Sequence, residues 1–388
     1  MDFTFSEEQR AAVEAARAVF SDVAPDRAPS PALTPGAVAE DIDRQLWNEL
    51  ARTDLLGLTL SPDHGGAGLD PIALCLVLRE SAKVLARVPL LESCAVAMAV
   101  QRYGGSALAA ELLPRAGRGE LILTVGANGR SGHDPAELAV AARPHGESGE
   151  IGASAERSGW VLDGVQSAVP WAQAADWIAV PAHTAEDRPV LALVPRTRDG
   201  VTLADQVSTS GERLAEVRLD GVRVTAHELI DAPGCWEWLR SLLTTGTCAL
   251  ALGLGERVLA MTAEYTGKRE QFGFPVATFQ AVAVQAADRY IDLRAMEATL
   301  WQAAWRISSD AGGPLPTAGD IAVAKIWASD GVRRVVQTAQ HLHGGFGADT
   351  DYPLHRFHAW AKQIELSLGP AAAHEEALGD LLAAHPLG

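Results

Sequence analysis

The spacing of apolar residues changes twice along this 388-residue chain, and these changes limit its possible folds more than any single motif does. Through about residue 118, apolar residues recur at steps of three and four, as in residues 46–56 and 72–85, which indicates helices. Short β-prone runs then alternate with turn residues, before helical spacing returns. We predict an α+β protein with an N-terminal helical domain (1–118), a middle antiparallel β domain (119–228) and a C-terminal helical bundle (229–388).

Local signals place individual elements within these zones. Ser6 before two glutamates is typical of a helix N-cap. In the middle zone, Asp163-Gly164 between apolar runs predicts a hairpin with a type I′ turn, and Asp220-Gly221 repeats the pattern. Residues 177–180 and 190–194 read as further strands, so we expect a small antiparallel barrel or sandwich. The last zone predicts three long helices, over residues 239–268, 279–309 and 317–342.

The charge balance argues against nucleic acid and membrane as partners. The formal net charge is −17, and an acidic surface repels nucleic acid and anionic lipid alike. The uncharged run between Arg240 and Glu256 is too short and too rich in Thr and Gly to predict a membrane span. The first residues lack the basic and apolar regions of a signal peptide. The cysteines form no CxxC pair, which indicates buried, reduced thiols in a cytoplasmic protein; they are Cys75, Cys94, Cys235 and Cys248.

A first candidate motif, YTGKREQFGFPVATFQ, spans residues 265–280. Arg269 offers a rigid fork of donors that suits a phosphate, and Gly273 allows a tight turn. Phe272 and Phe279 could form the walls around an aromatic ring. An ordinary helix end with basic residues and a turn is the simpler interpretation of these residues alone.

A second candidate motif, QHLHGGFG, spans residues 340–347 and follows a predicted helix. Its three glycines would let the backbone approach a ligand closely. Taken alone it is weak evidence, because phosphate loops usually precede a helix. The His-x-His spacing has no acidic or thiol partner at ligand distance, so we expect no metal site here.

The order and separation of the two motifs resemble the acyl-CoA dehydrogenase family. Two N-terminal segments also resemble it: FSEEQ at residues 5–9 and the turn PDHGGAG at residues 62–68. The resemblance covers nearly the whole chain, and it implies an acyl-CoA dehydrogenase-like fold with helical, β and helical domains. It also implies FAD-dependent oxidation of an acyl-CoA to the 2,3-enoyl-CoA. In that reaction a carboxylate takes the α-proton, the β-hydride passes to the flavin, and an electron-transfer flavoprotein then accepts the electrons.

The resemblance further implies that FAD lies across a subunit interface, with the two motifs holding its ADP half from the neighbouring subunit. Arg269 and Gln271 would meet the pyrophosphate, and Phe272 and Gln280 would line the adenosine side. The glycine turn would approach the same half. The expected cofactor contacts are Arg269, Gln271, Phe272, Phe279, Gln280, His341, Gly344, Gly345 and Gly347.

The chain departs from the family pattern where catalysis takes place. The two positions that can hold the catalytic Glu align with Leu243 and Leu368, and an aliphatic side chain cannot abstract a proton. The nearest carboxylate is Glu365, which more simply reads as a solvated charge on a helix. The usual flavin-binding loop reads LTVGANGRSG at residues 123–132. Pro170 stands at the Thr whose hydrogen bond to the flavin is expected, and it has no N–H or hydroxyl to offer.

These departures predict a subunit without a catalytic base that lends the ADP half-site to a homologous, Glu-bearing partner. The segment DYPLHRF at residues 351–357, AKQIEL at 361–366 and the Val169-Pro170 strand resemble actinobacterial α2β2 acyl-CoA dehydrogenases that act on cholesterol side-chain CoA thioesters. The expected partners are that subunit, an acyl-CoA and an electron-transfer flavoprotein. Two alternatives stay open: a self-sufficient homotetramer that uses an unusual base such as Glu365, and a flavin-free structural subunit.

Overall fold

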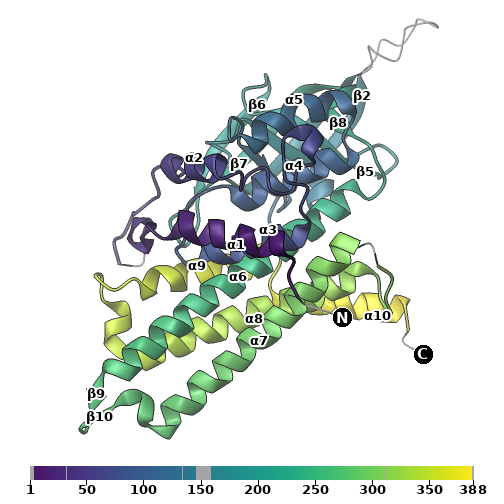
Figure 1. Ribbon diagram of the computed structural model, residues 1–388. Helices are drawn as coiled ribbons and strands as arrows, with labels where there is room; N and C mark the ends of the chain where they lie inside the picture. The colour runs from purple at the N-terminus through teal and green to yellow at the C-terminus, as the bar shows by residue number, and fades with distance from the viewer. Residues whose placement is uncertain (1–3, 32, 133, 146–158, 310, 387–388) are drawn as a thin grey trace, which may run out of the picture.

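The computed structural model describes residues 4–386 except 32, 133, 146–158 and 310, so residues 1–3, at the start of the segment examined for a signal peptide, lie outside it. Figure 1 shows the sheet and the N-terminal helices at one end, with long C-terminal helices extending away from them. The predicted sequence of helical, β and helical domains is confirmed. The N-terminal helices are α1 (Glu7–Phe20), α2 (Arg44–Arg52), α3 (Pro71–Ala82), α4 (Leu90–Tyr103) and α5 (Ser106–Gly117).

The first helix begins where the sequence indicates. The Ser6 hydroxyl accepts a hydrogen bond from the Gln9 N–H at 3.1 Å, and the Ser6 N–H donates to the Gln9 side chain at 2.9 Å. This reciprocal capping box satisfies two backbone donors that a helix start leaves free. Short 3-10 turns connect other elements; they are η1 (Pro25–Arg27), η2 (Pro62–His64), η3 (Ala136–Ala139), η5 (Ala226–Glu228) and η6 (Val276–Thr278).

The middle domain is one mixed sheet rather than an antiparallel barrel or sandwich. Its strands are β1 (Leu123–Val125), β2 (Val140–His145), β3 (Gly159–Pro170), β4 (Trp177–His183), β5 (Pro189–Pro195), β6 (Val201–Val207), β7 (Arg213–Thr225) and β8 (Leu229–Ile230). The order β6-β7-β3-β2-β4-β5-β8 leaves β6 and β8 as the ends, and β1 pairs with β4. Both β1 and β2 run parallel to β4, because each reaches it through a long connection, and the other pairs are antiparallel.

Neither Asp-Gly pair forms a hairpin turn. Both lie inside long strands, β3 and β7, that pair with each other. The register shifts between Leu162 and Gly164, and the Gly221 N–H donates to the Asp163 side chain at 2.8 Å. A side chain at Gly164 would lie 2.2 Å from the Ala139 carbonyl oxygen, so the glycine permits close approach of β2. The predicted type I′ hairpin was wrong because the same dipeptide here forms a β-bulge.

The C-terminal domain contains the three predicted long helices, whose ends differ from prediction by at most a few residues. It comprises α6 (Cys235–Lys268), α7 (Gln280–Ser309), α8 (Thr317–His343), α9 (Leu354–Leu366) and α10 (Ala371–Ala384), with the short strands β9 (Glu270–Gln271) and β10 (Phe274–Pro275) between α6 and α7. Among the described residues, α6 alone is long and apolar enough to span a membrane by length and composition. Its apolar window is 78% buried inside the protein, as in the core helix of a globular domain.

One large hydrophobic core joins the N-terminal and C-terminal helices, and a smaller one lies within the sheet. All four cysteines are free and buried, as the sequence indicates. The first core brings α4, α6 and α9 together, and their meeting point with the sheet forms the candidate site.

Candidate functional site

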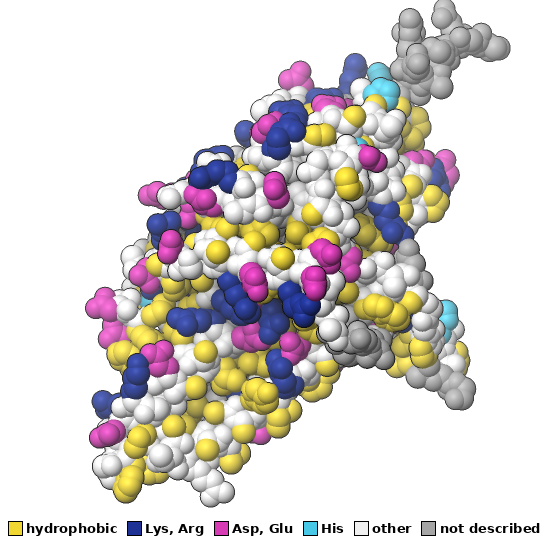
Figure 2. Space-filling view, in the orientation of Figure 1, with side chains coloured by type: hydrophobic (Ala, Val, Ile, Leu, Met, Phe, Trp, Pro, Cys, Tyr) yellow, Lys and Arg dark blue, Asp and Glu magenta, His cyan; other side chains and the backbone are white. Residues whose placement is uncertain are grey.

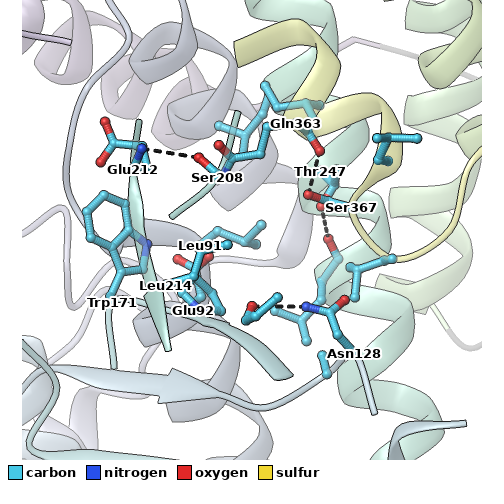
Figure 3. A pocket seen from close by; sticks show the side chains of 18 of the residues that line it. Leu91, Glu92, Asn128, Trp171, Ser208, Glu212, Leu214, Thr247, Gln363 and Ser367 are labelled. Carbon is cyan, nitrogen blue, oxygen red and sulfur yellow. Dashed lines mark hydrogen bonds between the residues drawn. The ribbon is translucent and has the colours of Figure 1, made fainter. Parts of the chain in front are cut away.

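A cavity of about 760 Å³ opens where the sheet meets helices α4, α6 and α9. Its walls come from segments that are far apart in sequence (Figure 3). Leu91 and Glu92 come from α4, Leu243 from α6, and Leu368 from the residues after α9. Residues of α3, of the segment before α4, of the loop after β1 and of the ends of β3, β6 and β7 also line it. The tertiary structure therefore brings Leu243 and Leu368, the two positions at which the sequence analysis expects the family's base, to one cavity.

Neither base position offers a proton acceptor on its side chain. Leu243 is buried on α6, where its carbonyl accepts a bond from the Thr247 hydroxyl at 2.9 Å. Leu368 has a left-handed backbone, with φ of 57°, and Gly369 follows with φ of 98°. The Leu368 carbonyl lies 2.9 Å from His374 Nε2. The cavity thus keeps these two positions on its wall but has only aliphatic side chains there.

The weak candidate Glu365 lies outside the cavity lining. Its carboxylate pairs with Lys362 at 2.6 Å and lies 3.8 Å from Arg333. Its backbone carbonyl accepts a bond at 3.0 Å from Lys325, a buried amine whose pKa burial lowers to about 8. The contacts with Arg333 and Lys325, both on α8, hold the C-terminal end of α9 in place. Glu365 therefore acts as part of an ion-pair cluster in this structure.

The sequence analysis missed a carboxylate that does line the cavity. Glu92, near the start of α4, is partly buried, and desolvation raises its pKa to about 7, while a hydrogen bond from Trp171 opposes that rise. Its signal in the sequence is a lone carboxylate in the apolar run 88–100. A cleft carboxyl with a strongly raised pKa is a functional-site candidate.

The end of β3 that the sequence analysis expects to face the flavin offers no side-chain hydrogen bond at Pro170. Pro170 and Trp171 both line the cavity, and Trp171 has a left-handed backbone with φ of 57°. Ala168 is also left-handed, at 50°, and its carbonyl accepts a bond from the Asn128 amide at 3.1 Å. Pro170 supplies neither N–H nor hydroxyl to a flavin. An indole instead stands directly after it on the cavity wall (Figure 3).

The first motif projects from the far end of α6. Arg269, Gln271 and Gln280 are exposed, and in the described part of the chain no partner to the Arg269 guanidinium occurs within hydrogen-bonding distance. Phe272 and Gly273 form the turn between β9 and β10, with φ of 55° and 81°. Phe272 is 89% exposed and meets Phe279 edge-on, with ring centroids 6.3 Å apart. The Arg269 guanidinium and the Phe272 ring are free to meet a ligand outside the chain, whereas the Gln271 amide donates a bond to the Glu270 carbonyl at 2.9 Å.

The second motif ends α8 and continues as the 3-10 turn η7 (Gly344–Ala348). His341, Gly344 and Gly345 are exposed, and Gly344 is left-handed with φ of 60°. Gly347 is buried, and a side chain there would lie 2.8 Å from the Gln340 amide nitrogen. Gly347 is therefore closed off by the Gln340 side chain, whereas the other three are open to a ligand.

An aromatic cluster brings the two motifs together at one end of the bundle. Tyr265 stacks on His343 and on Phe346, with ring centroids 4.5 Å and 5.1 Å apart. His343 is buried between the Ala339 carbonyl at 2.8 Å and the Tyr352 hydroxyl at 3.1 Å, and burial lowers its pKa. This histidine holds the turn rather than a ligand. Across the ranges that the structure describes, no group of three or more His, Cys, Asp or Glu residues could hold a metal.

Comparison with known protein families identifies both helical domains. Residues 6–120 match the acyl-CoA dehydrogenase N-terminal domain, and residues 243–382 match the acyl-CoA dehydrogenase C-terminal domain. The chain is 35% identical to the acyl-CoA dehydrogenase FadE27 of Mycobacterium tuberculosis over 349 residues, which cover 89% of each protein.

Solved structures of similar chains support the same family. The ChsE4-ChsE5 complex of Mycobacterium tuberculosis contains a chain that is 34% identical, with a TM-score of 0.87 over the full length of both chains. A chain of a variant of the Tcur3481-Tcur3483 steroid ACAD is 36% identical, with a TM-score of 0.86 over 97% of this chain and 98% of that one. Butyryl-CoA dehydrogenase of Megasphaera elsdenii shares the fold at 22% identity, with a TM-score of 0.84 over 99% of this chain and 100% of that one. FAD is the cofactor that this family indicates. The chain therefore belongs to the acyl-CoA dehydrogenase family.

Proposed function

We propose that this chain is the base-lacking subunit of a heterotetrameric, FAD-dependent acyl-CoA dehydrogenase of the cytoplasm. The observation that carries the proposal is that Leu243 and Leu368, the two positions where the family places its base, both face the cavity as leucines. Pro170 and Trp171 replace the flavin-ring contacts on the same cavity. At these positions the described chain thus offers no side-chain base and no hydrogen bond for a flavin ring.

The ADP half-site supports a role in a partner's active site. Arg269 and Gln271 are exposed and have capacity for a pyrophosphate, because an arginine fork binds phosphate oxygens in pairs. The exposed glycine turn after α8 lies at the same end of the bundle. Bound FAD would supply a hydride acceptor in the partner, and the electrons would pass to an electron-transfer flavoprotein. This chain would hold the nucleotide end of that cofactor.

The surface around the half-site supports the presence of a partner. Figure 2 shows hydrophobic side chains gathered over the lower part of the C-terminal bundle. The exposed large hydrophobic residues of the β9–β10 hairpin and α7 include Phe272, Phe274, Val284 and Ile291. Phe272 combines 89% exposure with a left-handed backbone, which is unfavourable for a bulky residue without compensating contacts. Exposed apolar patches of this kind mark protein interfaces.

The comparisons support a heteromeric steroid enzyme. The two similar solved chains belong to the ChsE4-ChsE5 complex and to the Tcur3481-Tcur3483 steroid ACAD. We propose by similarity that the assembly is α2β2 and that its substrate is a steroid side-chain CoA thioester. The Glu-bearing partner would provide the base and the flavin-ring seat.

Flavin content tests this proposal directly. Co-expression with a homologous, Glu-bearing subunit should give two flavins per α2β2 tetramer, whereas the chain alone should hold little flavin and show no turnover. The measurement is flavin absorbance per tetramer mass, with dehydrogenation assayed by electron transfer to an artificial acceptor. Four flavins per tetramer would contradict the shared site, and full turnover by the chain alone would favour a homotetramer.

Replacing Arg269 tests which chain holds the ADP half. In the co-expressed complex, Arg269→Ala should weaken FAD binding by about 10-fold to 100-fold, because a charge-assisted bond to phosphate contributes about 1.5–3 kcal/mol. The exposed Arg10→Ala on α1 is the matched control and should leave FAD affinity unchanged. If Arg269→Ala keeps full flavin content after dilution, the chain serves assembly without touching the cofactor.

One observation favours a second candidate, a self-sufficient dehydrogenase. Glu92 faces the cavity with a pKa raised to about 7 by burial, which suits a general base. In that case the chain alone would bind flavin and turn over, and Glu92→Gln would abolish turnover while flavin stayed bound. The absence of activity in the chain alone would exclude this candidate.

A further inference from the structure

A smaller pocket of about 280 Å³ adjoins the cavity and shares Trp171, Glu212 and Arg213 with its wall. We call it the side pocket; residues from the segments 39–44, 171–174 and 212–213 line it together with Arg87. Figure 3 shows Glu212 and Trp171 on the same side of the cavity. The described lining of the side pocket includes neither of the two base positions and none of the expected FAD contacts. Its side chains are therefore open to a role that the proposed function does not assign.

Two buried acceptors in the side pocket have no hydrogen-bond partner among the described residues. The Glu212 side chain is 5% exposed; its Oε1 accepts a bond from Arg87 Nε at 2.9 Å, whereas its Oε2 has no partner. Gln173 Nε2 donates to the Leu214 carbonyl at 2.8 Å and to Asp205 at 3.0 Å, which fixes the orientation of the amide and leaves Oε1 unpartnered. Buried polar groups are normally hydrogen-bonded, so these two acceptors indicate a ligand that donates two hydrogens.

The formal charges of the side pocket cancel. Its described lining has three carboxylates and three guanidinium groups, from Glu40, Asp41, Glu212, Arg44, Arg87 and Arg213. Arg87 pairs with Glu212, Arg44 donates to Asp41 at 3.2 Å, and Glu40 is exposed to solvent. A further buried charge would have no buried counterion left to it, and burying an unpaired charge is costly. The complementary ligand group is therefore neutral.

The remaining wall groups specify the ligand further. Arg87 uses Nε and Nη2 for Glu212 and for the Asp41 carbonyl, so Nη1 can donate to a ligand carbonyl. The Trp171 indole provides a flat apolar wall, and its N–H already bonds Glu92. Trp360 Nε1, another buried atom without a partner in the part of the chain that the structure describes, lines the cavity but not the side pocket. A primary carboxamide matches this set, because it has two N–H hydrogens, one carbonyl and no charge.

We propose that the side pocket binds a small aromatic primary carboxamide, whose NH₂ group donates to Glu212 Oε2 and Gln173 Oε1 and whose ring lies against Trp171. Aromatic rings pack favourably on an indole face or edge. A carboxylate of the same shape would bring a negative charge to Glu212, and an amine would bring a positive charge to Arg87. The site needs neither a flavin nor a catalytic base, so it goes beyond the proposed function.

Fluorine NMR titration of the co-purified complex tests the site with 4-fluorobenzamide as the probe. The titration is run at about pH 8, because burial raises the pKa of the Glu212 carboxyl and the acceptor is its ionised form. We expect saturable binding with a Kd of about 1 mM or tighter. The N-methyl amide, with one N–H, should bind at least about 10-fold more weakly, and the N,N-dimethyl amide should not bind. Tighter binding of 4-fluorobenzylamine or 4-fluorobenzoate would overturn the proposal, because charge would then select the ligand.

Variants of the side pocket locate the binding. Gln173→Met removes one acceptor and should abolish the preference for the primary amide over the N-methyl amide, and Ala174→Phe should fill the side pocket and remove binding. Gln337→Met, on the exposed face of α8, is the matched control and should bind as the wild type does. Absence of saturable binding to the wild type, or a preference that survives Gln173→Met, overturns the inference. Flavin content of the same complexes tests the proposed function separately.

Discussion

At the residue scale, Glu92 is a carboxyl whose surroundings change its ordinary acid–base chemistry. It stands in an apolar helix, and desolvation raises its pKa to about 7. Because the folded protein binds this proton more tightly than the unfolded chain does, the linked stability is fully present below about pH 4.5 and is lost as the pH rises to about 7. At neutral pH the folded chain therefore bears the free-energy cost of ionising Glu92 in its apolar surroundings.

Glu92→Gln should remove that pH dependence. The amide still accepts a bond from Trp171 but cannot ionise, so the variant should gain stability relative to the wild type between pH 5 and pH 8, on the order of 2 kcal/mol. Chemical unfolding at the two pH values measures the difference. The exposed Glu111→Gln is the control and should show no such change. An equal pH response in wild type and Glu92→Gln would contradict a desolvated Glu92.

At the element scale, one glycine sets how closely two helices cross. Gly253 of α6 packs against the backbone of α3, and a side chain at this position would lie 1.9 Å from the Arg79 carbonyl oxygen. That oxygen belongs to the backbone and cannot rotate away. Beside this crossing, the Arg79 side chain pairs with Glu256 and lies 3.4 Å from Glu297. The crossing joins the N-terminal helices to the bundle and so supports the cavity between them.

Gly253→Ala should destabilise the chain by at least about 2 kcal/mol, because the helices must separate to admit the methyl group. Gly379→Ala on α10 is a matched control, since nothing lies within 4 Å of the added carbon. That control should stabilise the helix by up to about 1 kcal/mol. Urea unfolding of both variants measures the contrast. Equal behaviour of the two would show that α3 and α6 are not in close contact.

At the scale of the whole molecule, four buried thiols couple the fold to alkaline pH. Burial raises the pKa of Cys94 and Cys248 to about 12 and that of Cys235 to about 11, and it raises the pKa of Cys75 as well. The unfolded chain loses these protons near pH 9, whereas the folded chain keeps them. Their stabilisation is therefore complete below about pH 9 and is lost as the pH rises towards 11–12.

The free energy of unfolding should therefore fall steeply above about pH 9. Each thiol contributes about 1.4 kcal/mol per pH unit to that slope. Cys94→Ala removes one thiol and should reduce the slope by this amount, apart from a loss of packing that does not depend on pH. Urea unfolding between pH 8 and pH 10.5 measures both slopes. Unchanged slopes would mean that Cys94 is accessible to solvent in the folded chain.

The spacing of apolar residues predicted many of the helices, because it reflects which residues of one element face the core. The three long C-terminal helices and the N-cap at Ser6 follow from periodicity and capping. The hairpin turn predicted from Asp-Gly was wrong because a dipeptide specifies only a local conformation. Whether it forms a turn or a bulge depends on the neighbouring strand with which it pairs. The parallel pairing of β1 and β2 with β4 was equally invisible, since it joins segments that are distant in sequence.

By itself, the sequence determined the family, through motifs whose residues must meet the same cofactor chemistry. It also predicted that leucines, Leu243 and Leu368, stand where the family places its base. Only the tertiary structure decided that these leucines share a cavity, that Glu365 is tied up in ion pairs, and that Glu92 faces the cavity. The reason is physical: residue type can be read one position at a time. Burial and the pKa changes it produces depend on which distant segments pack together.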